Sequence, residues 1–345
     1  MQDALDHLFL GHPLSEAQSQ AAFGSVMDGA ATPEQIASLL TLLAKHAPTA
    51  DEIVGAVRAM RARMVRVQVP AGKMAVDIVG TGGDHAGTFN VSSAASFVAA
   101  AAGASSGMVI AKHGNRSVTS TTGSSQVLEA LGVTLTGVPA QLTRCLEEAG
   151  IAFLFAPNHH PAMKHAAPVR AALGFRTLFN VLGPLTNPTG AKRQVVGVFD
   201  RALMPVMAQA LVRLESEKAW VVHGELHAGQ GLDELSPTGA SSALKVAGGK
   251  IEEEAFAPQA LGLSGGDPVH LAAADPLASA KMIRNIFAGE KGLPRDAVVL
   301  NAAAALVVGE VATDLRQGLE MACAAIDSGR AAQVLAKLVE VSRVS

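Results

Sequence analysis

The sequence predicts an α/β protein in which a small N-terminal helical domain precedes a large α/β domain with a mostly parallel central sheet. The first 70 residues contain successive helix starts and no strand pattern. Apolar runs then alternate with helical patterns, which is typical of a parallel sheet covered by helices. Hydrophobic residues make up 49% of the 345 residues, as expected when strands are buried on both faces.

Three capping-box patterns organise the N-terminal domain. In each one, a Ser or Thr is followed three residues later by Gln or Glu and then by apolar residues at helical spacing. The pairs are Ser15 with Gln18, Thr32 with Gln35, and Thr49 with Glu52. So many apolar residues on so few helices suggest that part of their surface pairs with a second copy of the chain.

A turn at Pro70 to Gly72 ends this domain, which we place at residues 1–70. Around residues 160–185 the pattern becomes helical and rich in proline, so we expect this segment to leave the sheet domain and contact the helical one. The α/β domain is then expected to comprise residues 71–159 and 186–345.

Five apolar runs are predicted to form strands of the sheet, at residues 76–79, 108–111, 151–155, 195–199 and 219–223. Helices are expected between them at residues 93–102, 124–131 and 201–214. Residues 247–250 resemble a hairpin turn, and helices are expected from about residue 297 onward. Ligands of such sheets bind where the strands end and the loops begin.

Composition excludes several classes of protein. No apolar run approaches the roughly 20 residues that cross a bilayer, and the acidic N-terminus lacks the features of a secretory signal. We therefore expect a cytoplasmic protein without membrane contact. A net charge of −3 argues against a general nucleic-acid surface. Cys145 and Cys323 lie in helical patterns, so we expect burial rather than a disulfide or a nucleophile.

A glycine turn, Gly80-Thr81-Gly82-Gly83-Asp84, follows the first apolar run. Three glycines in four residues let the backbone approach a ligand closely and leave N–H groups free for an anion. The helix expected near Ser93 adds its positive end to the same place. The turn therefore predicts a phosphate site, and Asp84 implies a metal ion or sugar hydroxyls beside it.

The end of the second strand separates this site from a dinucleotide-binding fold. Such a fold places an acidic residue about 20 to 30 positions after the turn. Here the strand ends in the basic sequence Lys112-His113-Gly114-Asn115-Arg116, which favours a second contact to an anion. Residues 117–125 are almost all Gly, Ser or Thr, which suits phosphate oxygens, although a flexible linker would have the same composition.

Two further loops carry chemistry. Asp233 and Glu234 are adjacent carboxylates, which magnesium prefers beside a polyphosphate, although alone they would be read as solvated charges. Arg170 could bind a carboxylate with two hydrogen bonds, or it could be an ordinary surface residue. We interpret His223 with His227, and His159 with His160, as loop residues rather than metal ligands. No covalent nucleophile is recognised.

The ordered set of motifs resembles the anthranilate phosphoribosyltransferase family along nearly the whole chain. The matching segments are residues 80–84, 112–116, 160–165, 180–188 and 232–234. The resemblance implies a cleft between the two domains, a homodimer formed through the helical domains, and a site where phosphoribosyl pyrophosphate and anthranilate meet with Mg²⁺. It also implies attack of the anthranilate amine on C1 of the ribose as pyrophosphate leaves.

The resemblance also implies roles for individual residues. Phosphoribosyl pyrophosphate would be bound by Gly80, Gly83, Asp84, Thr88, Asn90, Val91, Ser92, Ser93, Lys112, His113, Gly114, Asn115, Arg116, Ser117, Val118, Thr119, Ser120 and Ser124. Anthranilate would be received by Gly80, His113, Asn115, Arg170 and Pro184. Magnesium would be held by Ser92, Asp233 and Glu234. No catalytic acid or base is assigned, because an aniline amine is already a neutral nucleophile.

Some positions depart from the commonest pattern of this family. They are Thr121 in place of lysine, Gln126 in place of aspartate, Ser93 in place of threonine, and a longer loop at residues 225–231. Two alternatives remain open. A pyrimidine nucleoside phosphorylase would share the fold but is opposed by Arg170 and the Asp233–Glu234 pair. A non-catalytic nucleic-acid-binding relative is opposed by the net charge of −3 and the intact motifs.

Overall fold

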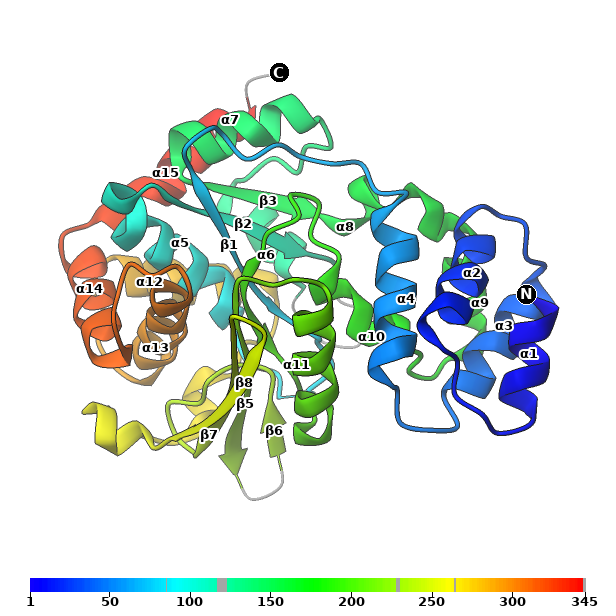
Figure 1. Cartoon of the computed structure of the whole chain (residues 1–345). Coiled ribbons are helices and arrows are strands. Elements are labelled where there is room, and N and C mark those ends of the chain that lie inside the picture. The colour runs from blue at the N-terminus through cyan, green and yellow to red at the C-terminus, as the bar shows by residue number, and fades with distance from the viewer. Residues whose placement is uncertain (85, 117–122, 228–229, 264, 344–345) are drawn as a thin grey trace.

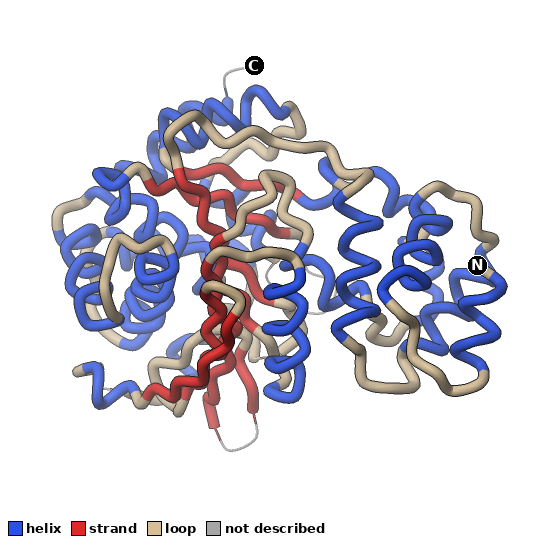
Figure 2. Tube along the Cα trace, in the orientation of Figure 1, coloured by secondary structure: helices blue, strands red, loops and turns tan. Residues whose placement is uncertain are grey.

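The computed structural model describes the chain except for residues 85, 117–122, 228–229, 264 and 344–345. A helical unit lies at one side of a larger unit in which helices cover both faces of a sheet (Figure 1). The tube view shows the strands gathered in the larger unit alone (Figure 2). Within the described residues, no helix is long and apolar enough to cross a membrane. The predicted fold class is confirmed.

The helical unit begins with four helices. They are α1 (Gln2–Phe9), α2 (Glu16–Met27), α3 (Pro33–Leu43) and α4 (Ala50–Arg61). All three predicted capping boxes are present before α2, α3 and α4, where the N-cap hydroxyl and the side chain three residues later satisfy each other's backbone N–H groups. Phe23 of α2 and Leu39 of α3 are fully buried between these helices.

The sheet contains five parallel strands followed by an antiparallel extension. The strands are β1 (Met74–Gly80), β2 (Met108–Gly114), β3 (Ile151–Phe155), β4 (Arg193–Gly197), β5 (Lys218–His227), β6 (Gln230–Leu232), β7 (Ser241–Ala247) and β8 (Lys250–Phe256). Their order is β3-β2-β1-β4-β5-β7-β8, with β6 paired to β5. Strands β1 to β5 pair in parallel, and β7 with β8 forms the predicted hairpin.

Helices on both faces complete the α/β unit. They are α5 (Val91–Gly103), α6 (Ser124–Leu131), α7 (Pro139–Ala149), α11 (Met204–Arg213), α12 (Pro276–Phe287), α13 (Leu293–Val308), α14 (Leu315–Asp327) and α15 (Arg330–Arg343). Helix α5 is buried on nearly every side, because it lies between the sheet and helices α13, α14 and α15. The C-terminal helices start earlier than predicted, since α12 begins after the cap at Asp275.

The segment between β3 and β4 packs against the helical unit. It forms α8 (Ala156–His159), a short turn (Pro161–His165), α9 (Ala167–Leu173), α10 (Phe179–Leu182) and a second turn (Gly183–Leu185). Helix α9 contacts α3, and α10 contacts α4. The ring of Phe179 meets that of Phe23 edge to face, with 5.4 Å between centroids. These contacts join the segment to the core of the helical unit.

Several loop predictions are wrong. His159 ends α8, and both His159 and His160 are buried. Nδ1 of His159 lies 3.0 Å from the carbonyl of Val65, so this ring nitrogen has a hydrogen-bond partner although it is buried. His223 and His227 belong to β5, which extends past the predicted end. The expected long loop at residues 225–231 is therefore occupied by β5 up to residue 227 and by β6 from residue 230.

Cys145 is buried, Cys323 is half-buried, and both are free thiols.

Candidate active site

The candidate site lies at the carboxyl ends of the parallel strands. Gly80 at the end of β1 pairs with Gly197 at the end of β4. The glycine turn follows Gly80, and the loop that carries Asp233 and Glu234 crosses directly over this pair of strand ends. The structure thus brings together two motifs that are about 150 residues apart in the sequence.

Glycine at two strand ends makes room for Asp233. A Cβ atom at Gly197 would lie 1.5 Å from the carbonyl oxygen of Asp233, and one at Gly80 would lie 2.1 Å from its Oδ2. The backbone N–H of Gly82 donates to the same Oδ2 at 2.7 Å. Asp233 is therefore seated on the backbone of β1 and β4, and Gly197 is a site residue that the sequence did not single out.

Three carboxylates converge above these glycines. Asp84, Asp233 and Glu234 each offer an oxygen within 4.8 Å of the others. Burial, and then the charge of Asp84, raises the pKa of Asp233 to about 7. Burial and Asp233 hold the pKa of Glu234 well above its usual value. Hard oxygen donors that repel one another in this way fit a divalent cation such as Mg²⁺.

Lys112 and Ser92 connect this cluster to the sheet. The ammonium of Lys112 donates to the carbonyl of Ile78 at 2.8 Å and to the Ser92 hydroxyl at 3.3 Å. The backbone N–H of Ser92 donates to Glu234 at 3.1 Å. Burial lowers the pKa of Lys112, although nearby carboxylates, Asp77 first, oppose that effect. The predicted magnesium ligand Ser92 is thus adjacent to the carboxylates.

A buried polar network fixes the end of β2. Asp77 on β1 accepts hydrogen bonds from the backbone N–H of His113 at 3.0 Å and from the side-chain amide of Asn187 at 2.7 Å. Asn187 also donates to the carbonyl of Ala111 at 2.7 Å. Burial raises the pKa of Asp77 to about 6. Asp77 was not predicted as a site residue, although an aspartate inside an apolar strand is a signal that the sequence contains.

The residues expected to receive anthranilate divide between two regions. Nδ1 of His113 lies 3.0 Å from the carbonyl of Gly183, which precedes Pro184, so these two predicted residues lie side by side. Burial lowers the pKa of His113 to about 3, which keeps the ring neutral. Arg170 on α9 lies over the ring of Phe179 at 5.1 Å. Among the described residues, no carboxylate forms an ion pair with Arg170.

Sequence models of two glycosyl transferase family domains match the chain. The helical bundle domain covers residues 2–64, and the a/b domain covers residues 72–332. An anthranilate phosphoribosyltransferase from Rubrobacter xylanophilus is 48% identical over 99% of this chain and 98% of its own length. The chain belongs to the anthranilate phosphoribosyltransferase family. The family and the class of enzyme that the motifs predict are confirmed.

Other members of the family agree in sequence and in structure. The one from Azorhizobium caulinodans is 44% identical, covering 99% of this chain and 95% of its own. The crystal structure of the Thermus thermophilus enzyme has a TM-score of 0.91 at 39% identity, covering 99% of this chain and all of its own. The Saccharomyces cerevisiae enzyme in complex with PRPP (phosphoribosyl pyrophosphate) and Mg has a TM-score of 0.87 at 26% identity, covering 99% and 97%.

The other residues that the family resemblance assigns to phosphoribosyl pyrophosphate lie near the start of α5 and of α6. Thr88 bridges to Ala272, and the N–H of Asn90 donates to Ser279 at 3.1 Å just before α5. Val91 and Ser93 are buried in the first turn of α5. Ser124 donates to the carbonyl of Asn115 at 3.1 Å.

Arg116 is exposed and pairs with Glu129 at 3.5 Å. Gly114 ends β2, where a Cβ atom would lie 2.6 Å from Phe153. Of the departures from the family pattern, Gln126 accepts from the N–H of Gly123 before α6. Ser117, Val118, Thr119, Ser120 and Thr121 lie outside the described residues.

Arg176 is a further residue beside the glycine turn that the sequence analysis missed. Its guanidinium donates to the carbonyl of Gly83 and lies 3.8 Å from the ring centroid of Phe199, which follows β4. The sequence offered one indication, namely that the arginine lies in the same segment of residues 160–185 as Arg170. Nothing in its local sequence shows that it reaches β4.

Proposed function

We propose that this chain transfers the phosphoribosyl group of phosphoribosyl pyrophosphate to the amine of anthranilate. The products are N-(5-phosphoribosyl)anthranilate and pyrophosphate. The observation that carries the proposal is the group of three carboxylates beside the glycine turn, in a chain that is 48% identical to a relative with this activity in its name. A pyrimidine nucleoside phosphorylase and a nucleic-acid-binding relative remain outcomes of the tests.

Phosphoribosyl pyrophosphate binds on the side of the glycine turn in this proposal. Asp84, Asp233 and Glu234, with the neighbouring Ser92, would hold Mg²⁺. When bound, this ion supplies positive charge that offsets the charge of the diphosphate. The N–H groups of Gly82 and Ser92 donate to Asp233 and Glu234 and so hold these carboxylates in place. The positive end of α5 lies beside them and favours an anion. Lys112 adds a buried cation beside Ser92.

Anthranilate binds on the side of the 160–185 segment. Arg170 presents a planar guanidinium, which can take a carboxylate through two parallel hydrogen bonds. His113, Asn115 and Pro184 form the neighbouring wall, with Gly80 at the strand end. Because His113 is neutral at physiological pH, it does not attract the substrate carboxylate away from Arg170.

The reaction then needs alignment and charge stabilisation more than proton transfer. The lone pair of the amine forms the C–N bond at C1 of the ribose while the bond from C1 to the diphosphate oxygen breaks and pyrophosphate takes the electron pair. The amine is neutral before attack and loses its proton after the bond forms. The protein contributes by holding both substrates in line and by stabilising the departing charge.

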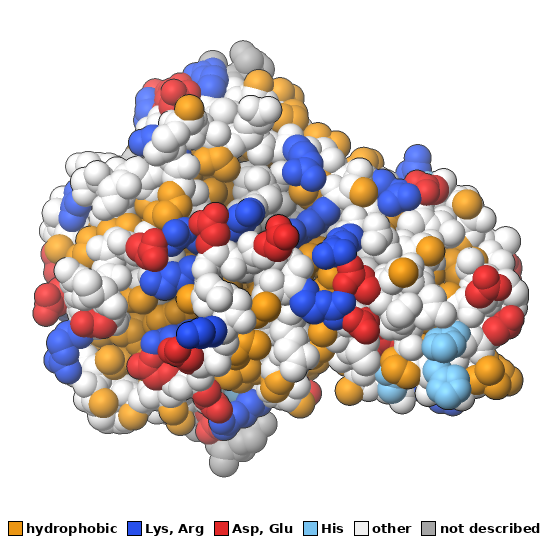
Figure 3. Space-filling view, viewed as in Figure 1, with side chains coloured by type: hydrophobic (Ala, Val, Ile, Leu, Met, Phe, Trp, Pro, Cys, Tyr) orange, Lys and Arg blue, Asp and Glu red, His pale blue; other side chains and the backbone are white. Residues whose placement is uncertain are grey.

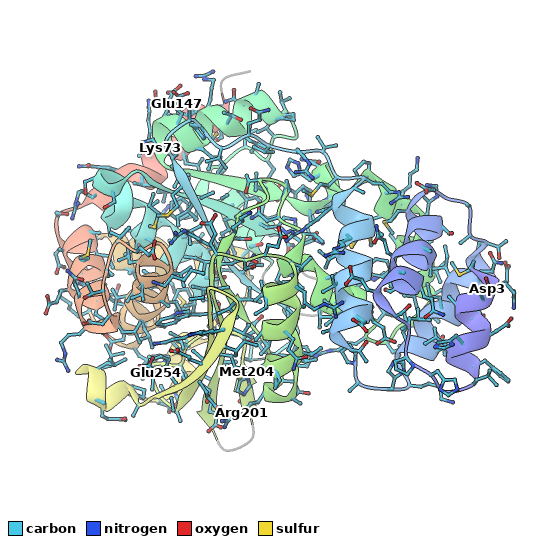
Figure 4. All side chains as sticks on the ribbon, viewed as in Figure 1. Asp3, Lys73, Glu147, Arg201, Met204 and Glu254 are labelled. Atoms are coloured by element: carbon cyan, nitrogen blue, oxygen red, sulfur yellow. The ribbon has the colours of Figure 1, made fainter. Side chains whose placement is uncertain are left out.

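The proposed reaction is tested by following anthranilate fluorescence with phosphoribosyl pyrophosphate and Mg²⁺. Replacing both Asp233 and Glu234 with Ala is expected to lower kcat/KM by about 10³, because the metal loses two ligands. The matched control is Asp3→Ala with Glu147→Ala, two exposed acids far from the strand ends (Figure 4). Full activity of the double variant at the same Mg²⁺ concentration would refute the metal assignment.

The results of two other assays would refute the function itself. Phosphorolysis of thymidine or uridine without anthranilate turnover would identify a nucleoside phosphorylase. Salt-sensitive DNA binding without transfer would identify a nucleic-acid-binding protein. Positive and negative side chains alternate on the face drawn in Figure 3, where no extended basic patch is seen among the described residues.

The role of Arg170 has its own test. Arg170→Ala is expected to raise the KM for anthranilate by about 10² through the loss of a bidentate pair, with little change for phosphoribosyl pyrophosphate. Lys73→Ala removes an exposed cation at the opposite end of β1 and should change neither constant (Figure 4). An effect confined to phosphoribosyl pyrophosphate would refute the carboxylate role.

We also propose that the chain is a cytoplasmic homodimer formed through the helical domain. Phe9 and Leu10 at the end of α1 are 79% and 71% exposed, which is costly for adjacent large apolar residues unless a partner covers them. Light scattering after size exclusion should give twice the mass of the chain, and Phe9→Ser with Leu10→Ser should shift the mass toward the monomer. A monomeric wild-type protein would contradict this assembly.

A further inference from the structure

Arg176 reaches the phosphoribosyl side of the site from the anthranilate side. It lies between α9 and α10, in the segment that carries Arg170. Its Nη2 donates to the carbonyl of Gly83, and its guanidinium carbon lies 3.8 Å from the ring centroid of Phe199. A planar cation on the face of a ring is held in position and in orientation.

The glycine turn leaves space that this guanidinium fills. Gly82 and Gly83 have φ angles of +71° and +80°, which side chains with a Cβ rarely adopt. A Cβ atom at Gly83 would lie 2.6 Å from Nη2 of Arg176. Glycine thus allows the turn both its conformation and its contact with the arginine.

The other side of the turn is held by β4. The backbone N–H of Thr81 donates to the carbonyl of Gly197 at 2.9 Å, and the backbone nitrogen of Phe199 lies 3.4 Å from the Thr81 hydroxyl. Arg176 therefore holds the turn at Gly83, while Thr81 ties it to β4. Between these two contacts, the N–H of Gly82 meets Asp233 and the chain continues to Asp84.

The support for Arg176 is the helical unit. The N–H of the next residue, Thr177, donates to Asn180 at 2.9 Å, which fixes the start of α10. Helix α10 packs against α4, and Phe179 packs against Phe23. A change in the position of this segment therefore reaches the glycine turn through the side chain of Arg176, which contacts both Gly83 and Phe199.

We propose that Arg176 is a positioning residue that holds the glycine turn so that Gly82 and Asp84 meet the other two carboxylates. In this role it organises the metal site before substrate arrives and couples the segment that carries Arg170 to the diphosphate side. The expected effect of Arg176 on catalysis rests on the function proposed above. Its effect on metal binding is a property of the protein alone.

The test measures metal affinity without substrate. Mn²⁺ replaces Mg²⁺ as the probe, and its free concentration is followed by electron paramagnetic resonance. Arg176→Ala is expected to weaken Mn²⁺ binding about tenfold, as is usual when a residue behind the metal ligands is removed. Arg316→Ala, on an exposed part of α14, is the matched control and should bind Mn²⁺ as the wild type does.

Kinetics separate positioning from direct contact with substrate. Arg176→Ala should raise the KM for phosphoribosyl pyrophosphate and lower kcat, each about tenfold, with the KM for anthranilate within about twofold. Arg176→Lys should recover part of the loss, because an ammonium can donate to Gly83 but cannot stack flat on Phe199. Unchanged Mn²⁺ affinity in Arg176→Ala, or a loss confined to the anthranilate KM, would overturn the proposal.

A second variant covers the case in which Arg176→Ala does not fold. Phe199→Leu removes the ring beneath the guanidinium and keeps the hydrogen bond to Gly83, so an intermediate loss of Mn²⁺ affinity is expected. If Phe199→Leu binds Mn²⁺ as tightly as the wild type, the positioning role is refuted. A wild-type protein that binds Mn²⁺ but does not transfer phosphoribosyl to anthranilate would refute the proposed function and leave the Mn²⁺ titrations to decide on Arg176.

Discussion

Asp233 lowers the stability of the folded, metal-free protein when its carboxylate is ionised. Its pKa is raised from 3.8 to about 7, first by burial and then by Asp84. Between these two pH values the folded protein retains a proton that the unfolded chain has lost. Stability therefore falls as pH rises through this window, and the loss persists above it. A bound divalent cation would reverse the effect by favouring the ionised carboxylates.

The raised pKa of Asp233 predicts how the stability of the metal-free protein depends on pH. In EDTA, the Tm of the wild type is expected to fall relative to that of Asp233→Asn as the pH rises from about 5 to about 8. The comparison of the two proteins cancels the contribution of His113, whose lowered pKa acts in the opposite direction. Asp233→Asn should have a Tm higher than the wild type at the upper pH by about 2 °C or more, because the amide is never charged and its oxygen can still accept from Gly82. Scanning fluorimetry with and without Mg²⁺ measures this. A lower Tm of Asp233→Asn under these conditions in EDTA would contradict the account.

Gly197 is the second residue whose effect can be predicted. An alanine there would place its Cβ 1.5 Å from the carbonyl oxygen of Asp233, so the loop must move. Gly197→Ala is expected to lower kcat/KM by at least about 10² while circular dichroism shows the wild-type secondary structure. Gly24→Ala is the control, because a Cβ at this position on α2 would lie 3.4 Å from its nearest neighbour, Arg63. Equal activity of the Gly197→Ala and Gly24→Ala variants would show that the close approach of Asp233 to Gly197 does not matter for activity.

At this scale, local sequence identified part of the site. The glycine turn is recognisable because three glycines in four residues are unusual, and Asp233 with Glu234 is recognisable only beside it, since adjacent acids alone in a loop are most often solvated charges. Gly197 and Arg176 were not identified, since each acts on a residue distant in the sequence. Their roles depend on which strand ends are neighbours, and the local sequence does not show that.

At the scale of elements, the ends of β1 and β2 are joined by side chains as well as by backbone hydrogen bonds. Asn187 donates to both Asp77 and the carbonyl of Ala111, and Asp77 receives the N–H of His113. The position of His113 therefore depends on a buried carboxylate that has two donors. Removing one donor leaves a buried acceptor unsatisfied, which costs more than the hydrogen bond itself contributed.

Asn187→Ala is expected to lower the free energy of unfolding by about 2–3 kcal/mol, measured by urea denaturation. The same variant should raise the KM for anthranilate, because Asp77, which accepts the backbone N–H of His113, is no longer held by Asn187. Asn285→Ala on the exposed face of α12 provides the control. A variant as stable as the wild type would show that another group satisfies Asp77.

The strands and helices with strong periodicity were predicted within a few residues. The parallel strands β1 to β5, the capped helices α2 to α4, and the turn between β7 and β8 all follow from apolar spacing and local turn chemistry. Helix α12 was missed, and so was the extension of β5. Strand β8 is exposed along nearly its whole length and contains Glu252, Glu253 and Glu254, so its sequence has no apolar face to reveal a strand.

At the scale of the whole molecule, two kinds of contact join the helical unit to the rest of the chain. Arg213 of α11 pairs with Glu16 of α2 and Asp51 of α4, but these side chains are partly exposed. The buried contacts come from residues 160–185, including Leu182, which is fully buried in the same core, and from α11, which packs against α4. Exposed ion pairs contribute little to stability, whereas buried apolar side chains contribute several times more.

The two contacts can be compared by substitution. Arg213→Ala is expected to lower the free energy of unfolding by less than about 1 kcal/mol. Leu182→Ala is expected to lower it by about 2–5 kcal/mol, because it leaves a cavity between α10 and α4. Urea denaturation of both variants under one condition decides the order. A larger effect of Arg213→Ala would mean that charge, and not packing, holds the units together.

The packing of residues 160–185 on the helical unit has a consequence for biosynthesis. The ribosome releases α1 to α4 early, yet Phe23 and its neighbours receive their partner Phe179 only much later. At the usual rate of elongation, the roughly 120 residues between the end of α4 and Phe179 take about 6–24 s. Throughout that interval the nascent helices present an apolar face that is open to chaperones. The first part of the chain to emerge is thus among the last to be completed.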